Sequence, residues 1–182
     1  MSNRLITLIR HGKVDGPAAL YGRTDIALSD AGRTDLQRAL RAIHQQTAID
    51  QIVSSPLQRC ASVAQEFSAQ YQLPLLIEPD LQEMNFGRWE LQPWPAVPRA
   101  EFDAWLADFA NHRFGGVEST QDVIDRVATV LADLQAELER RIPLIVLTGM
   151  NPVEITVEAD AVGLTGGDRR VDDRARLLLH AR

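Results

Sequence analysis

The sequence predicts an α/β fold, a three-layer sandwich in which a mainly parallel central sheet is covered by helices on both faces. Short apolar runs typical of buried strands occur at residues 5–9, 51–54, 75–77 and 144–147. Segments whose apolar residues recur at helical spacing lie between these runs. Alternating strands and helices favour a parallel sheet, because each helix returns the chain to the start of the next strand.

Capping residues indicate where the helices begin. Ser29, a preferred N-cap residue, precedes the first predicted helix. We interpret Ser55 and Pro56 as an N-cap followed by proline at the first helical position of the second helix. The spacing of apolar residues further predicts a short helix over residues 99–110 and a long helix over residues 120–141.

Length and composition indicate one soluble domain. The 182 residues suffice for a hydrophobic core without a disulfide or a metal. A formal net charge of −6 argues against nucleic acid and anionic membranes as partners. Cys60 is the only cysteine, which fits a reducing cytoplasm, and no apolar run approaches the length of a membrane span. We therefore expect a cytoplasmic protein, with a homodimer as one assembly that the sequence leaves open.

Cationic side chains follow the first two predicted strands. Arg10, His11 and Gly12 lead into a turn-rich loop over residues 12–30, and Arg59 lies one turn into the second helix. Ligands of open α/β sheets bind beyond the carboxyl ends of the strands, so we expect these residues to meet there. Two guanidinium groups can each bind two phosphate oxygens while a neutral histidine nitrogen approaches the phosphorus. The neighbouring positive charges are expected to keep His11 unprotonated near neutral pH.

Each of these signals also has an ordinary structural explanation. A single histidine after a strand is more often a hydrogen-bonded structural residue, and serine and proline before a helix form a common cap. A cationic site also fits a module that binds a phosphorylated ligand without turnover. Taken one by one, the residue types therefore leave an enzyme and a binding module open.

Three segments together resemble one protein family. The tripeptide RHG at residues 10–12, the run SSPLQR at residues 54–59 and the run LQEMNFGRWE at residues 81–90 match the motifs of the histidine phosphatase superfamily, also called the phosphoglycerate mutase-like proteins. The resemblance extends over residues 5–148 and implies the phosphoglycerate mutase-like version of the predicted sandwich. It also implies a phosphate monoester hydrolase that forms a phosphohistidine.

The resemblance implies the domain organisation as well. We expect a histidine phosphatase-like domain over residues 1–148. Residues 149–182 form an atypical C-terminal segment, without any aromatic residue, that completes this domain or is appended to it. Within this segment, residues 155–162 alternate in a way that is typical of a strand.

Individual residues receive roles from the same resemblance. His11 corresponds to the histidine that becomes phosphorylated, and Glu83 corresponds to the proton donor. Arg10 and Arg59 correspond to the phosphate-binding arginines. The positions expected to bind the rest of the substrate are Gly12, Lys13, Tyr21, Arg23 and Thr24. The scheme requires no metal and no cofactor. Without the family context, Glu83 is simply a solvated acid in a loop.

The substrate is expected to be a small phosphorylated molecule. The runs RHGKVD, LYGRTD, SSPLQRC and LQEMNFGRWE look most like those of α-ribazole-5'-phosphate phosphatases of cobalamin assembly. Trp89, Trp94 and Trp105 either line a pocket for a ring-shaped substrate or, as is more common for tryptophan, pack in the core. A phosphoglycerate mutase-like phosphotransferase is an alternative function within the same family.

One feature of the family is missing. In the family the last buried strand is followed by a second histidine that donates a hydrogen bond to the phosphoryl group, whereas here Thr148 is followed by Gly149 and Met150. Losing such a donor costs on the order of 100- to 1000-fold in rate. The chain is therefore expected to be an impaired phosphatase or, alternatively, a non-catalytic pseudophosphatase that binds a phosphorylated ligand.

A shift of the reading frame near Thr148 would explain this departure. If the codon of Gly149 ends in C, the overlapping frame across Gly149 and Met150 reads CAT, which encodes histidine. Sequencing of the underlying DNA tests this hypothesis, and the absence of a histidine codon from both shifted frames would rule it out.

Overall fold

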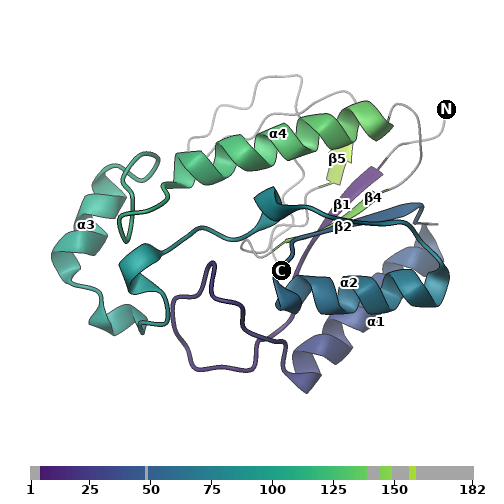
Figure 1. Cartoon of the computed structure of the whole chain (residues 1–182), viewed down its shortest axis with the longest axis horizontal. Helices are drawn as coiled ribbons and strands as arrows, with labels where there is room; N and C mark the ends of the chain where they lie inside the picture. Colours follow the sequence, from purple (N-terminus) through teal and green to yellow (C-terminus); the bar gives the residue numbers. More distant parts are fainter. Residues whose placement is uncertain (1–4, 48, 139–143, 149–155, 159–182) are drawn as a thin grey trace.

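The central sheet contains five strands among the residues that the computed structural model describes, which are 5–47, 49–138, 144–148 and 156–158. The strands lie in the order β3-β2-β4-β1-β5 (Figure 1). All neighbouring pairs are parallel except β1 and β5, which are antiparallel. The strands are β1 (Leu5–Arg10), β2 (Gln51–Ser54), β3 (Leu75–Ile77), β4 (Leu144–Thr148) and β5 (Thr156–Glu158).

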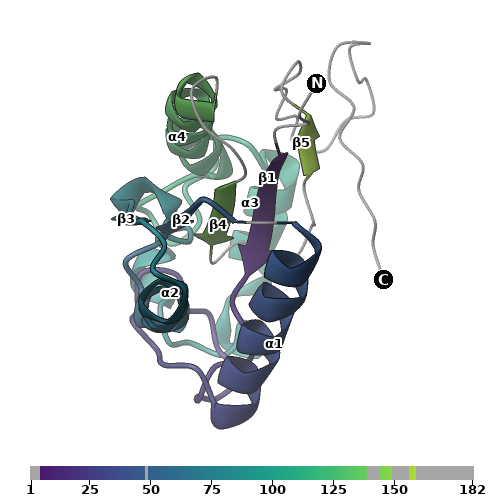
Figure 2. The same ribbon diagram turned by 90° about the vertical axis from the view of Figure 1, so that its right-hand side faces the viewer.

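Helices cover the two faces of this sheet. Helices α1 and α2 lie on one face and α4 lies on the other, as the end-on view in Figure 2 shows. This arrangement confirms the predicted three-layer α/β sandwich with a mainly parallel sheet. The helices are α1 (Asp30–Gln46), α2 (Gln58–Tyr71), α3 (Arg99–Ala107) and α4 (Thr120–Leu138), with short 3-10 turns at Pro79–Leu81, Gly87–Trp89 and Trp94–Ala96.

The strands bury alternate side chains in two separate apolar cores. On β2, Ile52 packs in the core beneath α1 and α2, whereas its neighbour Val53 packs in the core beneath α4. On β1, Ile6 and Leu8 point to the α4 side and Ile9 to the opposite side. A strand that is buried on both faces reads as a continuous apolar run, and this explains why the sequence predicted these strands well.

The start of α1 agrees with the sequence prediction, but the start of α2 does not. The Ser29 hydroxyl accepts a hydrogen bond from the Gly32 amide, as an N-cap should. By contrast, α2 begins only at Gln58, and Leu57 occupies its N-cap without a side-chain hydrogen bond. The acceptor comes instead from a distant loop, where Asp25 Oδ1 lies 2.7 Å from the Gln58 amide nitrogen. A cap supplied through tertiary contact leaves no local signal in the sequence.

One other predicted helix differs from the structure at its C-terminal end, and the end of the last predicted helix lies outside the described residues. The predicted helix over residues 99–110 ends as α3 at Ala107, and α4 is described only as far as Leu138. The strand expected within residues 155–162 is confirmed by β5, and the rest of the C-terminal segment lies outside the described residues. No helix in the described part of the chain combines the length and apolarity that a membrane span requires.

Candidate active site

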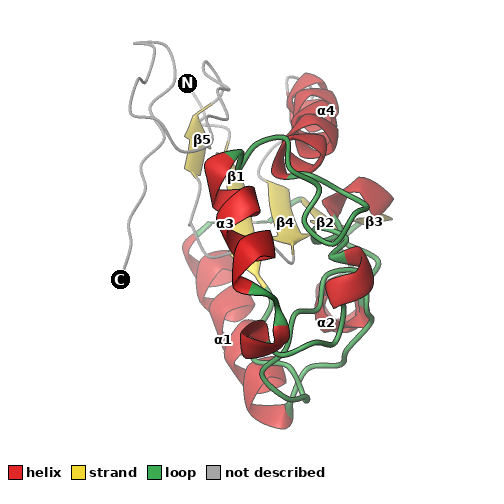
Figure 3. Cartoon of the chain, turned by 90° about the vertical axis from the view of Figure 1, so that its left-hand side faces the viewer, coloured by secondary structure: helices red, strands yellow, loops and turns green. Residues whose placement is uncertain are grey.

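The candidate site lies at the carboxyl ends of β1, β2 and β4. Arg10 at the end of β1 pairs in register with Thr148 of β4, and Ser54 at the end of β2 pairs with Leu147. Parallel strands that end together deliver their following loops to one edge of the sheet. Figure 3 shows the loops gathered at this edge, with α3 beside them.

His11 is buried and has a defined tautomer. Its Nδ1 lies 2.7 Å from the carbonyl oxygen of Gly12, and because a carbonyl only accepts, Nδ1 carries the hydrogen. The other ring nitrogen, Nε2, therefore presents its lone pair. Burial is the largest cause that lowers the pKa of His11 to about 4, and the charges of Arg59 and Arg10 add to this effect against the Gly12 hydrogen bond. The imidazole is thus neutral at physiological pH.

Arg59 is a fully buried cation at the start of α2. Its guanidinium donates hydrogen bonds to the carbonyl oxygens of Gly22, at 2.6 Å, and Thr24, at 2.9 Å. It also lies over the ring of Tyr21, 5.4 Å from the ring centroid. Among the ion pairs of the described residues none involves Arg59, so carbonyl and aromatic groups rather than a carboxylate surround its charge. A buried cation in this state favours a bound anion.

Glu83 has an environment that favours its protonated form. Burial raises the pKa of Glu83 above its ordinary value, although a hydrogen bond from the Met84 amide, 2.8 Å from Oε1, opposes the shift. The charges of Arg59, Arg10 and Arg126 oppose it as well. The carboxyl group therefore lies within the electrostatic range of three arginines yet retains a raised pKa, as a proton donor requires.

Glu90 fixes the loop that contains Tyr21. Its carboxylate accepts hydrogen bonds from the backbone amides of Gly22, Arg23, Thr24 and Phe86, at 3.0 to 3.1 Å, and from the Thr24 hydroxyl at 2.5 Å. Burial would raise the pKa of Glu90, but these hydrogen bonds outweigh it and lower the pKa. Sequence reasoning missed this role. The residue stands at the end of the run LQEMNFGRWE, yet its partners are distant in the chain.

Close backbone contact explains the glycine beside Tyr21. A Cβ atom on Gly22 would lie 1.6 Å from the carbonyl oxygen of Met84, so only glycine permits this approach. The contact brings the loop of residues 21–25 against the segment that carries Glu83. The motifs YGRTD and LQEMNFGRWE thus form one unit although they are far apart in the sequence.

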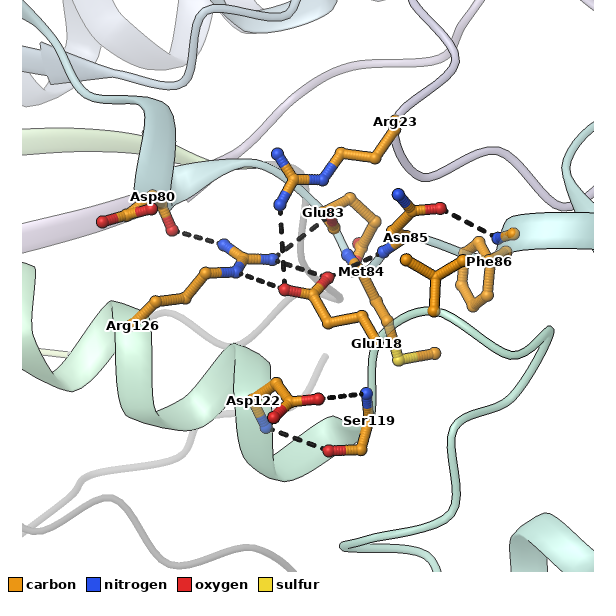
Figure 4. A network of polar contacts seen from close by, with 12 residues as sticks. Arg23, Asp80, Glu83, Met84, Asn85, Phe86, Glu118, Ser119, Asp122 and Arg126 are labelled. Carbon is orange, nitrogen blue, oxygen red and sulfur yellow. Dashed lines mark hydrogen bonds and ion pairs between the residues drawn. The ribbon is translucent and has the colours of Figure 1, made fainter.

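A second polar network surrounds the backbone of Glu83 (Figure 4). Glu118 Oε1 accepts a 2.8 Å hydrogen bond from Arg126 Nε and lies 3.7 Å from Arg23 Nη2, while Oε2 accepts from the Asn85 amide at 2.8 Å. Arg126 Nη2 in turn donates to the carbonyl oxygen of Glu83 at 3.3 Å. Glu118 lies in the loop before α4, where the sequence gave no signal for this contact, and Arg126 gave no signal apart from its place on a long helix.

A cavity of about 590 Å³ is lined by Arg10 and Glu83, whereas His11 and Arg59 are not among its described lining residues. Arg10, Tyr21 and Glu83 form its polar end, and apolar and aromatic side chains form the remainder. Two further polar atoms, Trp105 Nε1 and Thr120 Oγ1, are buried in residues that line the cavity and have no hydrogen-bond partner. The complete lining consists of Arg10, Ala19, Leu20, Tyr21, Glu83, Met84, Phe86, Trp94, Trp105, Phe109, Thr120, Val123 and Ile124.

The tryptophans divide between the two predicted interpretations. Trp94 and Trp105 line the cavity, as a pocket for a ring-shaped substrate requires. Trp89 is not among the described lining residues. Its ring packs near Phe114, at a centroid distance of 6.4 Å, and beneath Arg88.

The remaining predicted substrate-binding residues occupy different positions. A Cβ on Gly12 would lie 2.1 Å from the Gly32 carbonyl oxygen, so this glycine allows the start of α1 to pack against the site. Lys13 is exposed and contributes its carbonyl oxygen to Ser29 rather than its ammonium to the cavity. No cluster of potential metal ligands occurs among the described residues.

Comparison with known proteins places this geometry in a family. The family model for the histidine phosphatase superfamily (branch 1) matches residues 6–152. Phosphoglycerate mutase-like protein 4 of Arabidopsis thaliana is 30% identical over 134 residues, which cover 69% of this chain and 58% of that protein. A glucosyl-3-phosphoglycerate phosphatase of Mycolicibacterium vanbaalenii is 31% identical over 140 residues, which cover 74% of this chain and 61% of that protein. The chain thus spans about three fifths of the length of these relatives.

Among solved structures, an α-ribazole phosphatase from Shigella flexneri superimposes with a TM-score of 0.70 at 26% sequence identity. The match covers 79% of this chain and 73% of that structure. The two proteins therefore share the fold.

Proposed function

The chain belongs to the histidine phosphatase superfamily, and on this premise we propose that it hydrolyses small phosphate monoesters through a phosphohistidine on His11. One observation carries the proposal: the pKa of His11 is lowered to about 4 while the pKa of Glu83 is raised. Burial thus keeps the imidazole neutral and favours the protonated form of the carboxyl. Paired groups whose environments separate their pKa values are the usual basis of acid and base assignments.

In the first step His11 Nε2 attacks the phosphorus in line with the ester oxygen. The new P–N bond forms as the P–O bond to the leaving group breaks, and Glu83 transfers its proton to the departing alkoxide. Arg10 and Arg59 stabilise the charge on the equatorial phosphoryl oxygens. The products of this step are the free alcohol, phosphohistidine and the Glu83 carboxylate.

In the second step water replaces the histidine. The Glu83 carboxylate accepts a proton from the attacking water as the new P–O bond forms and the P–N bond breaks. Inorganic phosphate leaves, and both His11 and Glu83 return to their starting states. The chain's own side chains account for every proton in this cycle.

The cavity supports a substrate with a bulky ring rather than a second acid group. Trp94 and Trp105 offer aromatic surface, whereas Arg10 is the only basic residue in the described lining. A phosphoglycerate needs a further cation for its carboxylate, so this lining argues against the phosphoglycerate mutase-like alternative. We propose an α-ribazole-5'-phosphate type of substrate, and the similarity to the Shigella flexneri enzyme supports it.

A second candidate function follows from the sequence after β4. Because no histidine follows Thr148 directly, a non-catalytic module that binds a phosphorylated ligand is the alternative to slow hydrolysis. The proposed domain boundary at residues 148 and 149 coincides with this change. The buried guanidinium of Arg59, which forms no ion pair among the described residues, supports anion binding in either case.

Turnover of p-nitrophenyl phosphate separates the two functions. Slow release of nitrophenolate by the native chain that disappears in His11→Ala is expected for the phosphatase. Calorimetric binding of inorganic phosphate without any turnover would establish the binding module instead. The absence of both turnover and phosphate binding would refute the proposed site.

A further inference from the structure

We propose that Glu118 and Arg126 act as a positioning pair, which we call the clamp, that fixes the backbone of Glu83 so that its carboxyl faces the leaving group. This proposal rests on the proposed function, because the clamp positions the proton donor of that reaction. Nothing in the sequence motifs assigns this role to Glu118 or Arg126. The argument uses the polar network drawn in Figure 4.

Arg126 binds the segment on the N-terminal side of the donor. Its Nη1 donates to the carbonyl oxygen of Asp80 and its Nη2 to the carbonyl oxygen of Glu83. The guanidinium fork is rigid, so two carbonyl contacts from one side chain define the path of the backbone between them. Arg126 itself is anchored on α4, which packs against the sheet.

Glu118 binds the same segment on the C-terminal side. Its Oε2 accepts a hydrogen bond from the Asn85 amide at 2.8 Å, while both carboxylate oxygens accept from Arg126, at 2.8 and 3.3 Å. The two clamp side chains therefore contact the chain before and after Met84. Backbone rotation that would turn the Glu83 carboxyl away from the cavity has to break one of these bonds.

Low exposure strengthens this arrangement. The side chains of both clamp residues are only 12% exposed, so water competes weakly for their hydrogen bonds. Burial alone would raise the pKa of Glu118, but the Arg126 and Asn85 hydrogen bonds and the charges of Arg126 and Arg23 lower it. These contacts favour the ionised form of Glu118, whereas burial favours the protonated form of Glu83.

The clamp also contacts the substrate loop of residues 21–25. Arg23 Nη2 lies 3.7 Å from Glu118 Oε1. One carboxylate thus connects the segment that carries the proton donor with the loop that borders the cavity. Loss of the clamp is expected to affect the donor first, because its direct hydrogen bonds go to the donor's backbone.

The matched variants are Arg126→Gln, Arg126→Lys and, as a control, Arg113→Gln. Arg113 lies in the loop before α4, pairs with Asp122 on α4 and donates to the Val117 carbonyl oxygen. None of its described contacts reaches the segment of Glu83. The Gln variant removes both the charge and the fork. The Lys variant retains the charge, so it separates an electrostatic effect from a geometric one.

Two readouts are combined on the full-length chain. Amide hydrogen exchange of peptides from residues 80–87 reports the order of the segment without reference to catalysis. The second readout is the rate constant kcat/KM for glycerol 2-phosphate and for p-nitrophenyl phosphate, which reports formation of the phosphohistidine and not its later hydrolysis. These two rates report the proton donor, because an alkoxide needs a proton to leave and nitrophenolate does not. A purely structural defect lowers both rates equally.

We expect Arg126→Gln to accelerate exchange in residues 80–87 and to lower the glycerol phosphate rate by about 100-fold, the effect of a displaced catalytic group. The nitrophenyl phosphate rate should fall much less, Arg126→Lys should recover little, and Arg113→Gln should resemble the native chain in both assays. Unchanged exchange in Arg126→Gln, or equal losses on the two esters, would overturn the clamp.

The same design separates failure of the clamp from failure of the proposed function. If the native chain hydrolyses neither ester, the phosphatase proposal fails. The exchange comparison of Arg126→Gln with Arg113→Gln then decides by itself whether the clamp orders the segment of Glu83.

Discussion

Glu83 and Glu90 lie in one short segment and have opposite environments. The Glu83 carboxyl accepts a single described backbone hydrogen bond, from Met84, and its pKa is raised by burial. The Glu90 carboxylate accepts hydrogen bonds from several backbone amides and from a hydroxyl, and these bonds together lower its pKa. Burial raises the pKa of both groups, but Glu83 is more deeply buried and has one described donor, whereas the several donors to Glu90 outweigh its smaller burial.

The difference shows that two carboxyl groups in one segment can have different roles, one chemical and one structural. A carboxylate that accepts hydrogen bonds from several amides favours its ionised form, and it holds two segments of the chain together. A carboxyl that is buried with few donors keeps its proton and can transfer it. The nearby arginines do not remove this distinction, because their charges only partly offset the cost of desolvating Glu83.

The largest expected effect comes from removing the proton donor. Glu83→Gln should lower the rate of hydrolysis of an alkyl phosphate by about 100- to 10,000-fold, the usual contribution of general acid catalysis. Parallel urea unfolding should show little loss of stability, because the raised pKa means that folding already disfavours the charged form. Equal rates for the variant and the native chain would show that Glu83 is not the donor.

The next effect concerns the group missing after β4. A chain with the corrected reading frame after Thr148 should hydrolyse esters about 100- to 1000-fold faster than the native chain, because it regains a hydrogen-bond donor to the phosphoryl group. In that chain the pKa of Glu83 should still be raised and the pKa of Glu90 should still be lowered. If the corrected chain is no faster than the native one, the assignment of a missing hydrogen-bond donor after β4 is contradicted.

A smaller effect, on stability rather than chemistry, is expected for the second glutamate. Glu90→Gln should lower the free energy of unfolding by about 1–3 kcal/mol at pH 7, since buried donors lose a charged acceptor. Because the folded pKa of Glu90 is lowered, this stabilisation is present above its unfolded pKa and disappears as the pH falls through the folded value.

Urea unfolding at several pH values measures this difference. Glu101→Gln provides the control, because Glu101 pairs with the half-exposed Arg88 and should contribute little. A stability difference between Glu90→Gln and the native chain that grows on acidification would have the wrong sign and would refute the interpretation.

The smallest expected change is in the pH dependence of the nucleophile. With the pKa of His11 at about 4, kcat/KM should change less than about twofold between pH 7 and pH 5, whereas a histidine at the ordinary value of 6.5 would lose about 25-fold. The steady-state rates with p-nitrophenyl phosphate over this range provide the test. A steep acid limb centred near pH 6.5 would contradict the burial argument.

The sequence predicted the parts of this site that depend on strands and motifs. The apolar run before Arg10 and the strand before Ser55 are local signals, and parallel strands necessarily bring their ends together. The roles of the phosphate arginines, His11 and Glu83 come from the family resemblance, and they stay predictions. The histidine phosphatase resemblance is confirmed by the family match over residues 6–152.

What the sequence did not predict depends on contacts between distant segments. Asp25 caps α2, Glu90 binds the loop of residues 21–24, and Glu118 binds Arg126 beside Glu83. Each of these acids looks like an ordinary surface residue in the sequence. Only tertiary structure shows which backbone amides face a given carboxylate, because loop paths carry no periodic pattern.

The most direct test of the central claim is detection of the covalent intermediate. Mixing the native chain with p-nitrophenyl phosphate, quenching in alkaline denaturant and mapping the peptides by mass spectrometry should locate a phosphoryl group on His11. The Glu83→Gln variant should accumulate more of it, because water attack on the phosphohistidine lacks its base. Release of nitrophenolate without any phosphoryl group on His11, in either chain, would contradict the proposed mechanism.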